Sequence, residues 1–187
     1  MEYELVELKD EDIPLAQSLC DRHVGEGLYD RVDFENIISD AGRFFYFIKV
    51  EDAIAGYFYC MYYEYYSDEL LKELRLEQIS DKIRNMGTVG ICKSIGLNEE
   101  VRGKGISDSL LNYFTGLLFE KGCDEVLIPA WKQGDYVPAG KHLARCGFEN
   151  IALLKHPWIE EKGLKCPYCN KGRCVCDAYV FAKKKNG

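Results

Sequence analysis

Four cysteines near the end of the chain have the spacing of a metal site. Cys166 and Cys169 form a Cys-x-x-Cys pair, and Cys174 and Cys176 follow after four intervening residues. Four thiolates this close together suit closed tetrahedral coordination, which Zn²⁺ accepts without redox chemistry. An iron–sulfur cluster and a redox-switching disulfide are the alternatives. The spacing favours a structural zinc, because four thiolates leave no open position for catalysis.

A second candidate site is a glycine-rich turn in the middle of the chain. Gly103 and Gly105 alternate with the basic Arg102 and Lys104, after an expected strand and before an expected helix. Unpaired amides at a helix N-terminus favour an anion, and glycine lets the backbone approach it closely. A turn that only joins strand to helix is the alternative, and the spacing matches neither a P-loop nor a Rossmann fingerprint. We expect a phosphate group at this turn.

The apolar periodicity predicts the elements that position these two sites. Strands are expected at residues 3–8, 44–50, 54–63, 88–97, 126–130, 148–155 and 177–183, and helices at 10–22, 32–41, 103–121 and 139–146, with a helical excursion at 67–83. The alternation of strand and helix after residue 88 implies a parallel crossover. The glycine turn therefore opens a helix, and the cysteines lie between the last two strands.

The residues around the glycine turn resemble motif A of the GNAT superfamily of acyl-CoA-dependent N-acyltransferases. Arg102, Gly105 and Ser107 occupy the positions of its Arg/Gln-x-x-Gly-x-Gly/Ala signature, where Ser107 is a small departure. Residues 139–148, which end in Gly-Phe, resemble the second motif of the family. The element order matches from residue 1 to about 155, and again at the last strand. Two motifs in the right order carry the resemblance better than either motif alone.

This resemblance implies an α/β fold of GNAT type. Its mixed sheet would be flanked by helices and splayed between the fourth and fifth strands. We expect a single acyltransferase domain over residues 1–187. Residues 157–176 would be a Cys₄ metal-binding insertion, a small knuckle between the last two strands.

The resemblance also implies acetyl-CoA as co-substrate, with direct transfer of the acetyl group to an amine. Backbone groups of Ile95 and Leu97 would bind the pantetheine arm and the thioester carbonyl, and the amides of residues 102–107 would bind the pyrophosphate. The cofactor-binding residues expected on this basis are Ile95, Leu97, Arg102, Gly103, Lys104, Gly105, Ile106 and Ser107. The chemistry needs a neutral amine, an oxyanion donor and a proton for the departing thiolate.

The groups that would move protons depart from the family pattern. Leu143 stands where relatives often have a tyrosine acid, and Val89 stands where some have a glutamate base. Tyr136 and His142 are the nearest donors by sequence, and Tyr136 is preferred because a phenol stays protonated at neutral pH. Glu64 or water would serve as the base. We therefore predict that catalysis persists slowly and depends on Tyr136.

Composition and charge limit the classes of partner that the chain can bind. The net charge is −7, but residues 155–187 carry eight Lys and Arg against three Asp and Glu, so the body is acidic and the tail is basic. An acidic body argues against nucleic acid and favours an amine acceptor, either a small molecule or a protein. The sequence is also compatible with a homodimer. The acceptor itself cannot be read from the sequence.

The remaining alternatives concern class and location. Instead of an enzyme, the chain could be a non-catalytic module that binds acyl-CoA or a partner through the cysteine knuckle and the basic tail. A third alternative is association with nucleic acid or the ribosome through the basic residues of the tail. With no apolar run long enough to cross a membrane and no secretory pattern at the N-terminus, we expect a cytoplasmic protein whose nine cysteines are mostly reduced. Trp131 could line a cleft or pack in the core.

Overall fold

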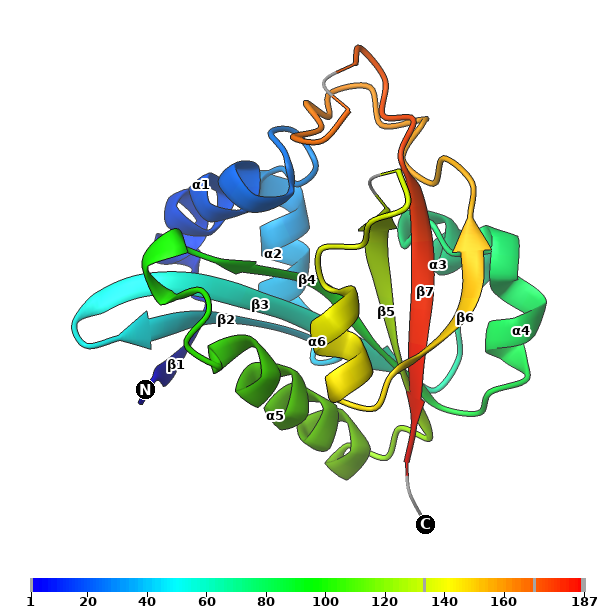
Figure 1. Cartoon of the computed structure of the whole chain (residues 1–187), viewed down its shortest axis with the longest axis horizontal. Helices are drawn as coiled ribbons and strands as arrows, with labels where there is room; N and C mark the ends of the chain where they lie inside the picture. The colour runs from blue at the N-terminus through cyan, green and yellow to red at the C-terminus, as the bar shows by residue number, and fades with distance from the viewer. Residues whose placement is uncertain (1, 133, 170, 186–187) are drawn as a thin grey trace.

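The computed structural model describes residues 2–132, 134–169 and 171–185 of the chain. These residues form seven strands and six α-helices in an order close to that predicted (Figure 1). The strands are β1 (Glu4–Glu7), β2 (Arg43–Val50), β3 (Ala53–Tyr63), β4 (Val89–Leu97), β5 (Glu125–Lys132), β6 (Glu149–Leu154) and β7 (Asp177–Lys184). The α-helices are α1 (Ile13–Val24), α2 (Arg31–Ser39), α3 (Asp68–Glu73), α4 (Ser80–Arg84), α5 (Ile106–Glu120) and α6 (Gly140–Arg145). Among these described helices, none is long and apolar enough to span a membrane.

All seven strands form one mixed sheet in the order β1-β2-β3-β4-β5-β7-β6. The β4–β5 pair is parallel, whereas the other pairs are antiparallel. The parallel pairing covers only Val89–Ile91 of β4 against Glu125–Leu127 of β5, after which the two strands diverge (Figure 1). The predicted α/β fold with a sheet splayed between its fourth and fifth strands is therefore confirmed.

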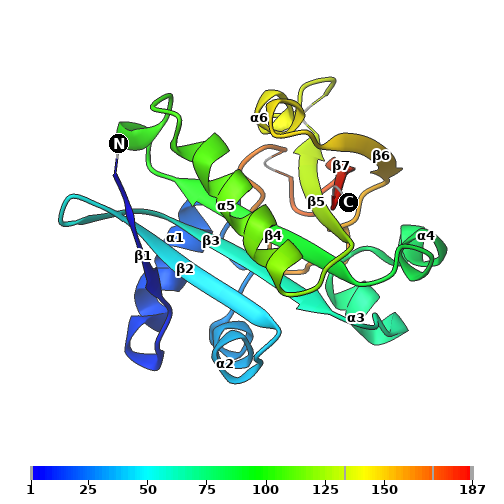
Figure 2. The ribbon, with the colours of Figure 1, turned by 90° about the horizontal axis from the view of Figure 1, so that it is seen from below.

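The helices cover the two faces of the sheet and create two hydrophobic cores. One core packs α1 and α2 against the sheet and includes Phe34, Phe45 and Tyr57. The other core packs α5 and α6 against the opposite face, where Phe58 and Phe114 stack with ring centroids 3.9 Å apart. Figure 2 shows α5 lying along one face, with α1 and α2 on the other. Because both faces are buried, the central strands β3 and β4 read as nearly continuous apolar runs.

A β-bulge interrupts β4 just beyond the point where β4 leaves β5. Cys60 and Tyr59 of β3 pair with Cys92 and Ser94 of β4, so Lys93 between them has no partner in β3. Before the bulge the odd-numbered residues of β4 face α1 and α2, and after it the even-numbered residues do. The bulge therefore turns Lys93 and Ser94 toward the same face of the sheet, as bulges near ligand sites commonly do.

Helix α5 begins at Ile106, three residues later than predicted. Gly103 and Gly105 adopt left-handed conformations, with φ of +73° and +79°, so they belong to the turn and not to the helix. This conformation carries almost no cost for glycine, whereas other residues rarely adopt it. The two glycines thus explain both the abrupt turn and the late start of the helix.

Candidate functional site

A cavity of about 260 Å³ passes through the sheet where β4 and β5 diverge. On the α5 face its walls are mainly apolar and include Ile95, Leu111 and Ile128. On the opposite face the walls are more polar, and include Tyr29, Asp33, Arg43, Glu73, Arg75 and Lys93. The cavity therefore connects the two faces, with an apolar end and a charged end.

The glycine turn precedes α5 and leaves open space above its backbone. A Cβ built on Gly103 or Gly105 would meet no described atom within 4 Å. The side chain of Arg102 folds back, and its Nε donates to the carbonyl of Leu97 over 2.8 Å. This contact fixes the turn against the end of β4. The turn can therefore accept an anion at the helix N-terminus, where α5 contributes its dipole.

The predicted pantetheine positions lie between the turn and the cavity. Ile95 lines the cavity, whereas the Leu97 carbonyl is occupied by Arg102. Opposite this end of β4, His23 Nε2 lies 3.1 Å from Asn98 Oδ1. Burial lowers the pKa of His23, so its imidazole is a poorer base than a free histidine. The roles of Ile95 and Leu97 toward a cofactor stay predictions.

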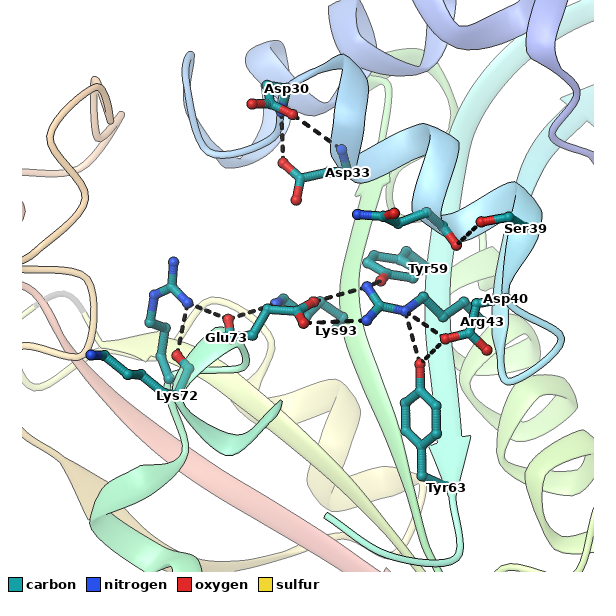
Figure 3. A network of polar contacts seen from close by, with 12 residues as sticks. Asp30, Asp33, Ser39, Asp40, Arg43, Tyr59, Tyr63, Lys72, Glu73 and Lys93 are labelled. Atoms are coloured by element: carbon teal, nitrogen blue, oxygen red, sulfur yellow. Dashed lines mark hydrogen bonds and ion pairs between the residues drawn. The ribbon is translucent and has the colours of Figure 1, made fainter. Parts of the chain in front are cut away.

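Arg43 organises the charged end of the cavity (Figure 3). Its guanidinium binds both carboxylate oxygens of Glu73, at 2.8 and 3.3 Å, and also contacts Asp40 at 3.2 Å. The hydroxyl of Tyr63 accepts from Arg43 over 2.8 Å and itself donates to Asp40. Such bidentate pairs hold their geometry well. Arg43 is thus neutralised by its neighbours and orients Glu73 at the cavity wall.

Lys93 is the lysine that lines the cavity, and it lacks a comparable partner. Its ammonium contacts the carbonyl of Glu73 at 3.4 Å, and no carboxylate of the described residues lies within 4.0 Å of it. Burial, reinforced by the nearby positive charge of Arg75, lowers the pKa of Lys93 to about 8. Arg75, by contrast, pairs with Glu161. A substantial fraction of Lys93 is therefore the neutral amine near physiological pH.

Aromatic side chains close the charged end. Trp131 of β5 packs against Trp158 and Tyr168 from the β6–β7 connection, with ring centroids 4.8 and 5.1 Å apart. All three residues line the cavity. The indole Nε1 of Trp131 is buried and has no hydrogen-bond partner among the described residues. An unpaired buried donor is costly, and this one belongs to a ring that lines the cavity.

The four cysteines come together in the β6–β7 connection. Their sulfur atoms all lie within 4.8 Å of one another, and the sulfurs of Cys166 and Cys176 are 3.8 Å apart. Tetrahedral Zn–S bonds of about 2.3 Å require sulfur–sulfur distances of about 3.8 Å. Burial alone would raise the pKa of Cys169, but backbone donors at Val175 and Lys171 lower it to about 7. The donor set and its spacing thus fit Zn²⁺.

The β6–β7 connection also reaches across to the α1–α2 loop. The amide of Lys165 donates to the carbonyl of Glu26 over 2.8 Å, and the two side chains form an ion pair at 2.6 Å. A Cβ on Gly27 would lie 2.5 Å from the carbonyl oxygen of Gly163. We call residues 25–28 and 163–168 the inter-loop bridge. It joins the two arms of the splayed sheet next to the charged end of the cavity.

The three residues predicted to move protons lie outside the walls of this cavity. Tyr136 is 59% exposed in the loop before α6. His142 of α6 is held by Asp108 of α5, with Nδ1 and Oδ1 2.5 Å apart, and the same carboxylate accepts from Arg145. Glu64 is exposed just after β3. The structure therefore does not bring these residues together with Ile95, and their catalytic roles stay predictions.

Comparison with known proteins identifies the family. The sequence profile described as "Acetyltransferase (GNAT) family" matches residues 7–148, which is most of the chain. The chain belongs to the GNAT acetyltransferase family. A search of curated proteins found no match. The family assignment therefore rests on the profile and agrees with the splayed sheet.

Solved structures share the GNAT fold at low sequence identity. An IAA acetyltransferase from Bacillus cereus ATCC 14579 is 14% identical, with a TM-score of 0.66 over 98% of this chain and 100% of that one. Arabidopsis thaliana NAA60 in complex with acetyl-CoA is 16% identical, with a TM-score of 0.68 over the full length of both chains. The spermidine/spermine N-acetyltransferase SpeG from Vibrio cholerae is 12% identical, with a TM-score of 0.62 over 97% of this chain and 93% of that one.

The charged end of the GNAT cavity was missed by sequence reasoning. Asp33, Arg43 and Glu73 come from three separate elements and Arg75 from the turn after α3, and no spacing in the sequence links them. Lys93 carried a signal that was readable, because it is a charged residue inside an apolar run that must be buried on both faces. A lysine at such a position indicates a bulge or a cavity.

Proposed function

We propose that this protein transfers an acetyl group from acetyl-CoA directly to an amine that enters the charged end of the cavity. The observation that carries the proposal is the passage through the sheet at the β4–β5 divergence. The glycine turn lies toward the α5 face, and the charged wall lies on the other. Two substrates approaching from opposite faces would therefore meet beside β4.

The coenzyme would be bound mainly by backbone groups. The amides of residues 102–107 would hold the pyrophosphate, since the turn is open and precedes a 15-residue helix. The pantetheine arm would run along β4 past Leu97 and Ile95 toward the cavity. Arg102 supports this arrangement indirectly, because its side chain ties the turn to the strand. Lys104 would add positive charge at the turn.

The acetyl carbonyl needs a donor when its oxygen becomes negative. The unpaired indole N–H of Trp131 is a candidate, because it is buried in the cavity wall on the β5 side of the divergence. The acceptor amine must lose a proton, and the departing thiolate must gain one. For these proton transfers we propose Tyr136, His142 and Glu64. Because all three lie outside the cavity walls, water would have to carry the proton between them and the substrates.

We further propose that Cys166, Cys169, Cys174 and Cys176 hold a structural Zn²⁺. The ion would supply a fixed tetrahedral link within the connection and no catalytic chemistry, because four thiolates complete its coordination. Residues 157–176 would then be a metal-holding insertion in a single domain that spans the chain. Because Trp158 and Tyr168 belong to this insertion, the metal would also stabilise one wall of the cavity.

Turnover tests this function directly. The purified protein would be incubated with acetyl-CoA and three acceptor panels: polyamines, free amino acids, and peptides with free N-termini. Mass spectrometry would detect acetylated products, and calorimetry would measure acetyl-CoA affinity separately. Acetylation of a member of one panel supports the proposal. Acetyl-CoA binding with no acetylated product from these panels or from a cell extract would favour the non-catalytic acyl-CoA-binding module.

A further inference from the structure

We infer that Lys93 is itself an acetyl acceptor: in the absence of a bound amine, its Nζ is acetylated by the acetyl-CoA held in the same cavity. The inference rests on the proposed binding of acetyl-CoA and goes beyond it. It assigns a covalent modification site inside the cavity. It also requires no knowledge of the physiological acceptor.

The first argument is the position of Lys93 on β4. It is the bulged residue, without a partner in β3, and it lies two residues beyond the last β4 position that pairs with β5. Without the bulge, Ser94 would lie on the opposite face of the sheet. The bulge therefore places an amine at the passage between the two faces. This is where the thioester must emerge if the coenzyme follows β4 from the glycine turn.

The second argument is that the amine of Lys93 is not tied to a carboxylate. The carboxylate of Glu73 is engaged by Arg43, and that of Asp33 accepts from the amide of Asp30 over 2.8 Å. The Nζ of Lys93 instead contacts the backbone carbonyl oxygen of Glu73, at 3.4 Å. Its long side chain can therefore reorient without breaking an ion pair.

The third argument is the protonation state of Lys93. The charged groups that act on it are Arg75 and Glu73, Asp33 of α2 and Arg43 of β2. Burial, reinforced by the positive charges of Arg75 and Arg43, outweighs the carboxylates of Glu73 and Asp33 and lowers the pKa of Lys93 from 10.5 to about 8. At neutral pH this shift raises the fraction of neutral amine by about 300-fold relative to an unshifted lysine. Only the neutral form is nucleophilic.

The chemistry is an aminolysis of a thioester and needs no further reactant. The lone pair of Nζ attacks the acetyl carbonyl carbon, and the carbon–nitrogen bond forms as the carbon–sulfur bond breaks. The electron pair of that bond leaves with sulfur, and the proton lost from Nζ neutralises the thiolate. The products are Nε-acetyl-lysine at position 93 and free CoA. Acetylation would also remove the charge of Lys93 from the acceptor end of the cavity, which Arg43 and Arg75 also line.

Mass spectrometry of the whole protein incubated with acetyl-CoA alone tests the inference. We expect one added acetyl group, mapped to Lys93 by peptide analysis, at a rate at least about 50-fold above that of any other lysine. The rate should be independent of protein concentration, because donor and acceptor share one cavity. It should rise with pH, reach about half of its maximum near pH 8 and level off about one pH unit higher, where most of Lys93 is neutral.

Two variants make the test specific. Lys93→Arg keeps the charge but removes the nucleophile, so the single fast acetylation should disappear. Lys72→Arg is the matched control, because Lys72 is exposed on the neighbouring α3, and the variant should be acetylated at Lys93 like the native protein. Calorimetry with acetyl-CoA on native protein and both variants shows that each still binds the coenzyme.

The outcomes separate this inference from the proposed function. Acetyl-CoA binding with no acetylation of Lys93 would overturn the inference and leave the proposed function standing. So would acetylation spread over the exposed lysines, or a rate that scales with protein concentration. Failure to bind acetyl-CoA would overturn the proposed function and the inference together. Fast, first-order acetylation that Lys93→Arg abolishes would establish both the site and the position of the thioester.

Discussion

At the scale of single residues, the glycine turn offers the most direct test of coenzyme binding. Gly105→Asp would place a carboxylate and a Cβ where the pyrophosphate is expected, in a backbone conformation that aspartate tolerates poorly. We expect acetyl-CoA affinity to fall at least tenfold, which corresponds to about 1.4 kcal/mol. Isothermal titration calorimetry measures this change.

Gly122→Asp is the control for this substitution. Gly122 follows the other end of α5, has a similarly left-handed φ of +96°, and leaves its Cβ position equally open. The two variants therefore share the added charge and a comparable backbone cost. Equal loss of acetyl-CoA affinity in both would contradict the assignment of the turn.

The sequence and the structure give different indications about the catalytic role of Tyr136. Its sequence position made it a candidate acid, and it is preferred to His142 because a phenol stays protonated at neutral pH. On that basis Tyr136→Phe should lower kcat at least tenfold while acetyl-CoA still binds. Its exposure and its position outside the cavity make Tyr29→Phe the informative comparison, since Tyr29 lines the cavity. If kcat responds to Tyr29→Phe alone, the sequence-based role of Tyr136 is excluded.

Residue types predicted some of the candidate site and could not have predicted the rest. The cysteine cluster and the glycine turn are contiguous in sequence, so their spacing carries the geometry. Asp33, Glu73 and Lys93 meet only because α2, α3 and β4 converge at the divergence of the sheet. Long-range convergence of this kind leaves no local pattern, and the bulge at Lys93 also broke the alternation that would have assigned its face.

At the scale of elements, the cysteine-rich connection should loosen as a unit when its metal ligands are lost. Cys169→Ser removes one of the four thiolates, and metal binding free energy is also folding free energy. We expect faster amide exchange across residues 157–176 with little change in β1–β4, measured by hydrogen–deuterium exchange. Cys146→Ser, a buried cysteine outside the cluster, should leave exchange in this segment unchanged.

Loss of the metal should also be visible in the fluorescence of the tryptophans. The chain contains two tryptophans, Trp131 and Trp158, and they contact each other beside the connection. Removing the metal with a chelator should therefore shift the tryptophan emission before the sheet unfolds. Elemental analysis showing about one zinc per chain would agree with this account, whereas iron with visible absorption would replace the zinc assignment by a cluster.

The inter-loop bridge gives a second prediction at this scale. Gly27→Ala places a Cβ against the backbone of Gly163 at a φ of +80°, so the variant should lose about 1–3 kcal/mol of stability. The amide of Lys165, which donates to Glu26, should then exchange faster. Gly122→Ala has a similar backbone conformation in open space, and faster exchange at Lys165 in that variant would show that the bridge is not the cause.

At the scale of the whole molecule, buried thiols predict how stability depends on pH. Burial raises the pKa of Cys60 and Cys92 above the ordinary value of 9.0, so the folded state keeps protons that the unfolded state has lost. The free energy of unfolding should therefore fall as pH rises above about 9. Denaturant titration measures this fall, and the double variant Cys60→Ala/Cys92→Ala should lose less stability over that range. Identical pH dependence would contradict the assignment.

The fold as a whole was predictable because its strongest signals are local. Periodicity located every strand of the sheet to within a few residues, and the family resemblance carried by the two motifs implied the split between the fourth and fifth strands. The sequence does not indicate how few residues of β4 pair with β5. That number depends on where the strands diverge, which follows from packing on both faces.

The position of β7 has a consequence for how the chain is made. β7 comes last among the elements, yet it lies between β5 and β6, with eight paired positions on β5 where β4 offers three. During synthesis the β1–β4 half can assemble as it leaves the ribosome, whereas β5 and β6 must wait for residues 177–184. The cysteine cluster emerges immediately before that strand. A metal bound by this cluster would order the connection that leads into β7, and would thereby help β7 to insert between β5 and β6.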